Sequence, residues 1–418
     1  MNDGWRLSHI PNRPQHWTDK TLNRHIPTSD IYLDHAATTP TDPSVVQAMA
    51  PYFTSSFGNP SSIYGPGQDA RAAVDRARNS VARTLGCQPA EVIFTSGATE
   101  SNNLALSGVA WAAKLADSSG VIPHVITTAI EHHAVLHSAE WLKQIGFEVT
   151  VVPCDEQGLV DPESVREAIK PATRLISVMY ANNEIGSIQP VDAIASIAHE
   201  HGIPVHTDAV QAPGFLPLNV DDLGVDLLSL SAHKFYGPKA VGVLYVRNGT
   251  PITYQQRGGG QESGRRGGTE NVPSIVGLGM SLEMADADRS SYSESCRELR
   301  NGLWESIQEM IGGVHLNGPD VSSAHRLPNN LNLAIEGIQG ETVLLSLDML
   351  GVAASAGSAC TTGNTQPSHV LTALGHPVER ARSSLRLTTG RCNTTGDIEE
   401  AVDALAATVS RIRELAAR

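Results

Sequence analysis

The sequence predicts an α/β fold, with a mostly parallel seven-stranded sheet in a large domain and a smaller α+β domain after it. Two observations carry this prediction. Between residues 91 and 246, seven short apolar runs rich in β-branched residues alternate with helical patterns. From residue 274 on, long helical patterns come first, and only two short strands follow. Strands that are continuously apolar are typical of parallel sheets covered on both faces.

The large domain is expected to alternate strands and helices along the chain. The seven expected strands are residues 91–94, 124–128, 148–152, 174–180, 203–208, 226–231 and 241–246. The expected helices between them are 99–116, 133–145, 162–169 and 191–201. Because ligands collect at the carboxyl ends of strands in such sheets, polar residues directly after these strands are the candidates for a site.

The rest of the chain predicts a second domain. Helical patterns cover residues 274–310, strands are expected near 329–334 and 384–387, and a closing helix begins at about residue 398. We therefore expect a large domain over residues 31–285, whose first residues could pack on the small domain, and a small domain over 286–418. Residues 1–30 are expected to form an N-terminal extension, either a flexible tail, which is favoured, or an arm on a partner subunit.

Composition excludes several classes of function. A net charge of −14 argues against a nucleic-acid surface, and no run approaches the roughly 18 apolar residues of a membrane span. No secretory signal opens the chain, so a cytoplasmic protein is expected. The five cysteines contain no C-x-x-C pair, which indicates neither a disulfide framework nor a metal site. Neither a Walker A loop nor a dinucleotide fingerprint occurs.

The segment from Phe94 to Glu100 follows an expected strand and opens a helix. Backbone N–H groups and the hydroxyl of Thr99 would face outward there with the positive end of the helix dipole, which suits a bound anion. When the segment is taken alone, an ordinary capped helix start is the favoured explanation, because strand-to-helix turns of this kind are common.

Polar residues also follow the later strands. His132 and Asn183 each stand beyond an expected strand, where they could contact a ligand or satisfy local hydrogen bonds. Asp208 and Lys234 end two further strands, so a carboxylate and a lysine could reach one cleft. A pyridine cofactor needs such an acid against its ring nitrogen and a lysine for its Schiff base.

Taken together and in this order, ten segments resemble the cysteine desulfurases of the class V aminotransferase family, the nitrogen-fixation and iron–sulfur-assembly type. The segments are residues 32–40, 57–62, 95–103, 131–136, 182–186, 206–211, 231–238, 258–271, 355–360 and 384–391. The resemblance implies fold type I of the enzymes that use pyridoxal 5'-phosphate, with sites at the interface of a homodimer. It also implies removal of sulfur from L-cysteine, leaving alanine and a persulfide for an acceptor protein.

By this resemblance, Lys234 would form the Schiff base and Asp208 would pair with the pyridine nitrogen. His132 would stack on the ring and share in catalysis. Gln211 and Asn183 would address the phenolic oxygen. The residues that would hold the phosphate are Ala98, Thr99, Ser231 and His233, with Thr269 reaching into the site of the neighbouring subunit.

The resemblance assigns the substrate to two further groups. Arg386, together with Asn183, would bind the substrate carboxylate, a task that suits the planar fork of a guanidinium. Cys360 would take the sulfur. It lies among small residues at 356–363, which suit a mobile loop better than a core, and a thiolate there could attack the sulfur of bound cysteine.

Two other functions fit the same scaffold. A selenocysteine lyase or another C–S lyase would differ in not requiring a persulfide on Cys360. A non-catalytic sulfur-relay subunit would keep the cofactor only for structure, and the presence of Lys234, Asp208, His132 and Arg386 together argues against it.

Overall fold

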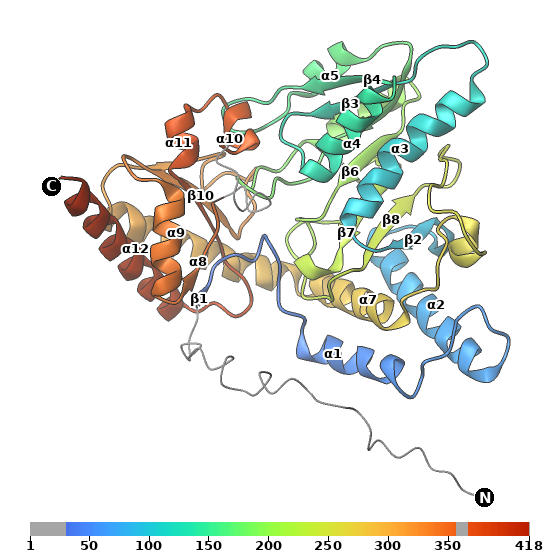
Figure 1. The fold of residues 1–418 in the computed structure, drawn as a ribbon, viewed down its shortest axis with the longest axis horizontal. Helices are drawn as coiled ribbons and strands as arrows, with labels where there is room; N and C mark the ends of the chain where they lie inside the picture. The colour runs from blue at the N-terminus through green and yellow to red at the C-terminus, as the bar shows by residue number, and fades with distance from the viewer. Residues whose placement is uncertain (1–30, 357–366, 418) are drawn as a thin grey trace, which may run out of the picture.

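The computed structural model of the protein describes residues 31–356 and 367–417. The expectation for residues 1–30 lies outside this part of the chain. Figure 1 shows a large sheet with its helices on the right and a smaller group of helices and strands on the left. No helix of the described residues is long and apolar enough to cross a membrane.

The large sheet has seven strands in the spatial order β2-β8-β7-β6-β5-β3-β4. Within it only β8 runs against its neighbours β2 and β7, and the other pairs are parallel. Six strands therefore end at one edge, which confirms the predicted mostly parallel sheet. The strands are β2 (Val92–Thr95), β3 (His124–Thr128), β4 (Glu148–Val152), β5 (Thr173–Ser177), β6 (Val205–Asp208), β7 (Leu227–Ser231) and β8 (Gly242–Val246).

Helices cover both faces of this sheet because its strands are apolar on both sides. Val125 of β3 packs in a core with α3 and α4, whereas the next residue, Ile126, packs in a core with α2, α6 and α7. Figure 1 shows α3 and α4 in front of the strands. The helices are α1 (Pro43–Met49), α2 (Gly65–Leu85), α3 (Ala98–Ala116), α4 (His133–Gln144), α5 (Pro162–Ala168), α6 (Val191–Glu200) and α7 (Val272–Ala287), with 3-10 turns η2 (Ala50–Phe53), η3 (Pro89–Glu91), η4 (Ala232–Lys234) and η5 (Gln261–Gly264).

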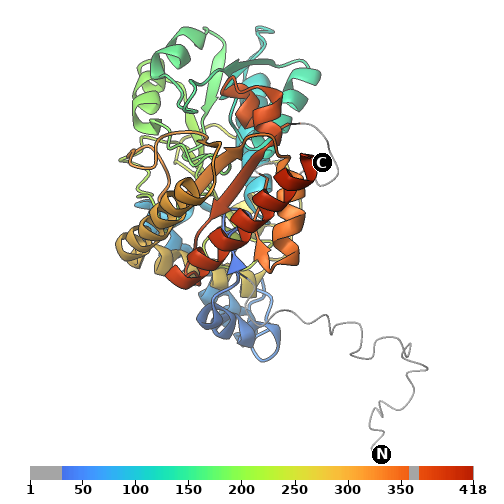
Figure 2. The ribbon, with the colours of Figure 1, turned by 90° about the vertical axis from the view of Figure 1, so that its left-hand side faces the viewer.

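The small domain has a core of its own, in which α8, α9 and α12 pack against the antiparallel sheet β12-β10-β9. The start of the described chain joins this core, because β1 runs parallel to β11 and contributes Ile31. In Figure 2 the small domain faces the viewer, with α12 running diagonally across it. Its elements are β1 (Ile31–Tyr32), α8 (Arg289–Met310), β9 (Val314–Leu316), β10 (Asn330–Ile335), α9 (Gly340–Met349), β11 (Val352–Ala353), α10 (His369–Ala373), α11 (Val378–Arg382), β12 (Ser384–Thr388) and α12 (Thr395–Ala416).

The predicted boundary at residues 285–286 lies at the end of α7, just before α8 begins at Arg289. The long helical pattern from residue 274 to 310 is thus two helices, and α7 packs with α2 in the large domain whereas α8 packs with α12 in the small one. The division into two domains at this point stays a prediction.

His206 lies in the middle of the large sheet and joins three strands. Its Nδ1 is 2.8 Å from the hydroxyl of Ser177 on β5, and its Nε2 is 3.0 Å from the hydroxyl of Ser229 on β7. Complete burial lowers the pKa of His206 to about 3, so the folded protein keeps the ring neutral in moderate acid. The unfolded chain takes up a proton near pH 6.5. The stability that this neutral ring contributes is therefore fully present above pH 6.5 and is lost as the pH falls toward 3.

We expect the free energy of unfolding of the native protein to exceed that of His206→Asn at pH 7, and this advantage to shrink by about 2 kcal/mol at pH 5. Asparagine does not titrate, so residue 206 takes up a proton on unfolding in the native protein but not in the variant. Urea unfolding at both pH values measures the change. The exposed His201→Asn serves as the control and should show no such shrinkage. An equal advantage at both pH values would contradict the assignment of a neutral His206.

Candidate active site

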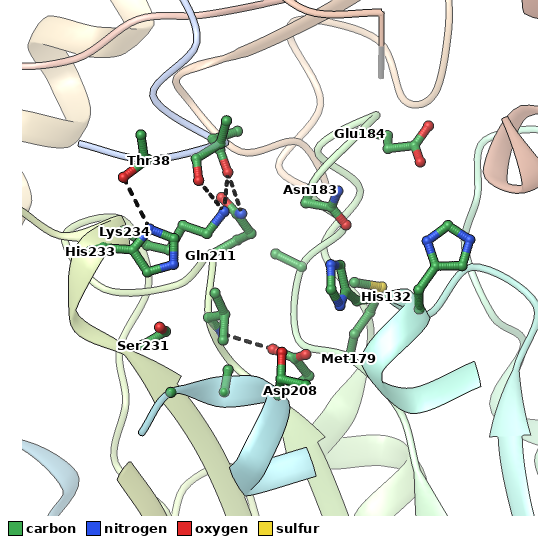
Figure 3. A pocket seen from close by; sticks show the side chains of 18 of the residues that line it. Thr38, His132, Met179, Asn183, Glu184, Asp208, Gln211, Ser231, His233 and Lys234 are labelled. Atoms are coloured by element: carbon green, nitrogen blue, oxygen red, sulfur yellow. Dashed lines mark hydrogen bonds between the residues drawn. The ribbon is translucent and has the colours of Figure 1, made fainter. Parts of the chain in front are cut away.

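A cavity of about 580 Å³ opens at the carboxyl edge of the large sheet. Figure 3 shows its side chains pointing toward one another from several strand ends. The structure brings together in its lining ten of the residues that the sequence predicted: Ala98, Thr99, His132, Asn183, Asp208, Gln211, Ser231, His233, Lys234 and Arg386.

The direction of the strands explains this convergence. Asp208 is the last residue of β6, and Ser231 is the last of β7, with Lys234 in the 3-10 turn that follows it. Because β2 runs parallel to β7, its end and the start of α3 reach the same edge. The small domain adds Arg386 from the middle of β12.

The start of α3 has the shape of an anion cradle. Gly97 precedes the helix with φ of 146°, a conformation that side-chain-bearing residues rarely adopt. A Cβ on Gly97 would lie 3.7 Å from the hydroxyl of Ser231, so the glycine keeps this corner open. The helix runs for 19 residues from Ala98, and its first N–H groups face the cavity edge with the positive end of the helix dipole.

Asp208 is almost completely buried beneath the cavity. Its Oδ2 accepts a hydrogen bond of 2.6 Å from the Nδ2 of Asn102, and its Oδ1 accepts one of 3.1 Å from the N–H of Val210. Asn102 lies on α3 and is fully buried. Sequence reasoning did not single it out, although a polar side chain on the apolar face of an expected helix was an available signal.

The ammonium group of Lys234 lies against the backbone of the segment that precedes α1. Its Nζ donates to the carbonyl oxygens of Ala36 and Ala37, at 2.6 and 2.7 Å. The Nε2 of Gln211 also donates to Ala36, at 3.0 Å. Two carbonyl acceptors compensate a cation that the cavity would otherwise desolvate.

Four imidazole rings border the cavity, those of His132, His133, His233 and His369, and burial lowers the pKa of each. Two of them, His132 and His233, are predicted site residues. The pKa of His233 falls to about 4, through burial first and then the nearby charges of Lys234 and Lys239. Burial also lowers the pKa of His132, while the charge of Asp208 opposes that shift. The N–H of Ala134 donates to Nδ1 of His132, which places the ring proton on Nε2. Both rings are therefore neutral at pH 7.

Arg386 is the cation at the other side of the cavity, and its side chain is 2% exposed. One of its terminal nitrogens donates to the carbonyl oxygen of Asn183 at 2.9 Å, and the other to Oδ1 of Asp34 at 2.6 Å. Its buried Nε has no hydrogen-bond partner among the described residues. A donor left in this state is suited to an anionic ligand.

Two buried acids near the cavity were missed by sequence reasoning. Burial raises the pKa of Glu131 to about 8, although its Oε1 accepts from the hydroxyl of Thr128 and the N–H of Met179. Burial also raises the pKa of Glu184, whose carboxyl group accepts a hydrogen bond from Ser368. Glu131 directly precedes His132, and Glu184 directly follows Asn183, and both neighbours are predicted site residues. The available signal was therefore the position of each glutamate in the sequence.

One predicted site residue that the structure describes is not brought into this cavity. Thr269 is exposed and does not line it. Cys360 lies outside the described residues, so its predicted place is not tested.

Comparison with known proteins identifies the family. The sequence profile of the aminotransferase class-V family matches residues 31–401. The cysteine desulfurase IscS of Dictyoglomus turgidum is 46% identical over 386 residues, which cover 92% of this chain and 96% of that protein.

Solved structures agree with the sequence relatives. A NifS-like protein superposes with a TM-score of 0.84 at 36% identity, covering 91% of this chain and 100% of its own. A structure described as SspA in complex with cysteine superposes with a TM-score of 0.76 at 39% identity, covering 86% of this chain and 99% of its own. Since profile, relatives and structures all span most of the chain, the protein belongs to the aminotransferase class-V family and, within it, to the cysteine desulfurases.

Proposed function

We propose that the chain holds pyridoxal 5'-phosphate in this cavity at Lys234, removes the sulfur of L-cysteine and passes it through Cys360 to an acceptor protein. The observation that carries the proposal is the meeting of Lys234, Asp208 and Arg386 around one cavity. A lysine, a buried carboxylate and a buried arginine are the three charges that a cofactor-bound amino acid requires.

The residues present fit this cofactor. The cradle at Gly97, which a Cβ would narrow, suits the phosphate, with Ser231 and His233 beside it. The carboxylate of Asp208 accepts hydrogen bonds from Asn102 and from the N–H of Val210, and it suits a protonated ring nitrogen. The further residues that would hold the group are Ala98, Thr99, His132, Asn183 and Gln211. Once bound, the cofactor supplies an electron-accepting ring that acidifies the α-carbon of the substrate.

Three side chains of the protein then carry out separate steps of the reaction. Arg386 binds the substrate carboxylate, and the amine of Lys234 accepts the proton from the α-carbon. The thiolate of Cys360 attacks the substrate sulfur, a new sulfur–sulfur bond forms and the carbon–sulfur bond breaks. The released carbon fragment gains protons and leaves as alanine, while Cys360 keeps the sulfur as a persulfide.

We further propose that two copies of the chain form the active enzyme in the cytoplasm. Large apolar side chains are exposed on the loop between η2 and α2, with Phe57 74% and Ile63 90% exposed. Such a group favours a protein interface. A second copy placed there would agree with Thr269 reaching a neighbouring site. Cys87, Cys154, Cys296 and Cys392 are free thiols, which suits a reducing compartment.

Borohydride reduction of the holoenzyme should leave the cofactor mass on the peptide that contains Lys234. We expect Lys234→Ala to lose this label and to make alanine at least about 100-fold more slowly, because no other amine takes both roles. Lys239→Ala is the matched control, since Lys239 lines the same cavity. This variant should keep the cofactor label and the native rate of alanine formation. Labelling of Lys239 in the native enzyme would overturn the assignment.

Cys360→Ser should still change the visible spectrum when cysteine is added but release almost no alanine, because a hydroxyl is a far weaker nucleophile toward sulfur than a thiolate. Mass spectrometry of the native enzyme treated with cysteine should find one added sulfur on the Cys360 peptide. Cys392→Ser serves as the control and should react normally. Turnover by Cys360→Ser at the native rate would favour a C–S lyase instead.

Thr269→Val should weaken cofactor retention without changing the melting temperature, because it removes a hydroxyl that acts in the neighbouring site. Dialysis followed by absorbance measures retention, and sedimentation reports the dimer. The control is Thr395→Val, at the exposed start of α12. A fully active monomer would contradict the shared site.

A further inference from the structure

The guanidinium of Arg386 is held by a carboxylate that stands outside the cavity. Arg386 lines the cavity and Asp34 does not, yet their side chains meet at 2.6 Å. Among the described residues, Asp34 is the one carboxylate within ion-pair distance of Arg386. A buried cation is costly unless it is paired, so this contact compensates the charge of the guanidinium and fixes its orientation.

The position of Asp34 is itself fixed by backbone bonds to the strand that carries Arg386. Asp34 forms a parallel bridge to Thr388, and the N–H of Thr388 donates to the carbonyl oxygen of Leu33 at 2.7 Å. The hydroxyl of Tyr32 donates to the carbonyl oxygen of Asp34 at 3.0 Å. Carboxylate and guanidinium therefore approach each other from two neighbouring, hydrogen-bonded segments.

The remaining donors of Arg386 match one further carboxylate. One terminal nitrogen donates to the carbonyl oxygen of Asn183, and the other donates to the carboxylate of Asp34. The Nε–H has no partner among the described residues. A guanidinium carries five N–H donors in one plane, so the fork can bind a second carboxylate while Asp34 keeps hold of it.

We propose that Asp34 is a positioning residue for the substrate carboxylate. This inference rests on the proposed function, in which Arg386 binds that group. Asp34 holds the guanidinium in the orientation that a carboxylate entering the cavity requires. Without it, the side chain of Arg386 would have to be reoriented each time a substrate bound, and that ordering would weaken binding.

The test compares two substrates that differ only in the carboxylate. L-cysteine has it, whereas cysteamine carries the same amine and thiol without it. Holoenzyme with Asp34→Ala or Asp34→Asn is titrated with each compound while the visible spectrum is followed, and KM and kcat for cysteine are measured. Thermal unfolding without substrate monitors the fold.

We expect Asp34→Ala to raise the apparent dissociation constant and the KM for cysteine about tenfold, the size of one charged hydrogen bond, with kcat changed much less. Asp34→Asn, which keeps the acceptor oxygen but not the charge, should show a smaller rise and covers the case in which the alanine variant fails to fold. The response to cysteamine should stay within about twofold of the native protein in both variants. Asp42→Asn is the matched control, because Asp42, just before α1, forms a second ion pair with Arg391, just after β12.

Three results separate the explanations. Unchanged or tighter cysteine binding by the Asp34 variants would overturn the proposal, since it would make Asp34 a bystander or a competitor of the substrate. Equal losses for cysteine and cysteamine would also overturn it, because Asp34 would then act on the fold or the cofactor. A native holoenzyme that shows no spectral response to cysteine would instead contradict the proposed function itself.

Discussion

The site depends on one short stretch of backbone, residues 34–39, which lies between the two domains and is bonded to both. Its carbonyl oxygens at Ala36 and Ala37 hold the ammonium of Lys234 in the large domain. Its Asp34 side chain holds Arg386 in the small one. The N–H of Thr39 donates to the carbonyl oxygen of His233 at 2.8 Å, which ties the stretch to the turn after β7. Lys234 and Arg386 therefore keep their spacing across the cavity through this stretch.

Burial changes the protonation states of several groups around the cavity. Burial keeps the rings of His132 and His233 neutral and favours the protonated form of Glu131. Asp208 is held differently, because its two oxygens accept hydrogen bonds from Asn102 and from a backbone N–H. The lining thus carries the acids Asp208 and Glu100 together with the cations Lys234, Lys239 and Arg386. This polarity suits a ligand that carries an anionic group at its edge and a basic nitrogen at its centre.

The sequence predicted the parts of the site that depend on local order along the chain. A residue that directly follows an apolar strand is carried to the edge of the sheet whatever the details of packing, which is why Asp208 and Lys234 were found. Residue pairs across the chain could not be found in this way. The contact between Asp34 and Arg386 depends on the register of a bridge to Thr388, more than 350 residues away in sequence, and Asn102 gains its role only when α3 packs over β6. The long helix α2 was not predicted because its buried face consists mostly of small residues (alanine, glycine and serine), which give a weak apolar signal.

The small domain is made from the two ends of the chain, and this has a consequence for synthesis. Ile31 and Leu33 belong to a core whose other members include Leu385 and Leu387. At about 5–20 residues per second, a ribosome delivers β12 on the order of tens of seconds after β1. The strands of the large sheet are complete by Val246 and can pack in the meantime. Ile31 and Leu33 therefore cannot complete this core until β12, the last strand of the described residues, has been made.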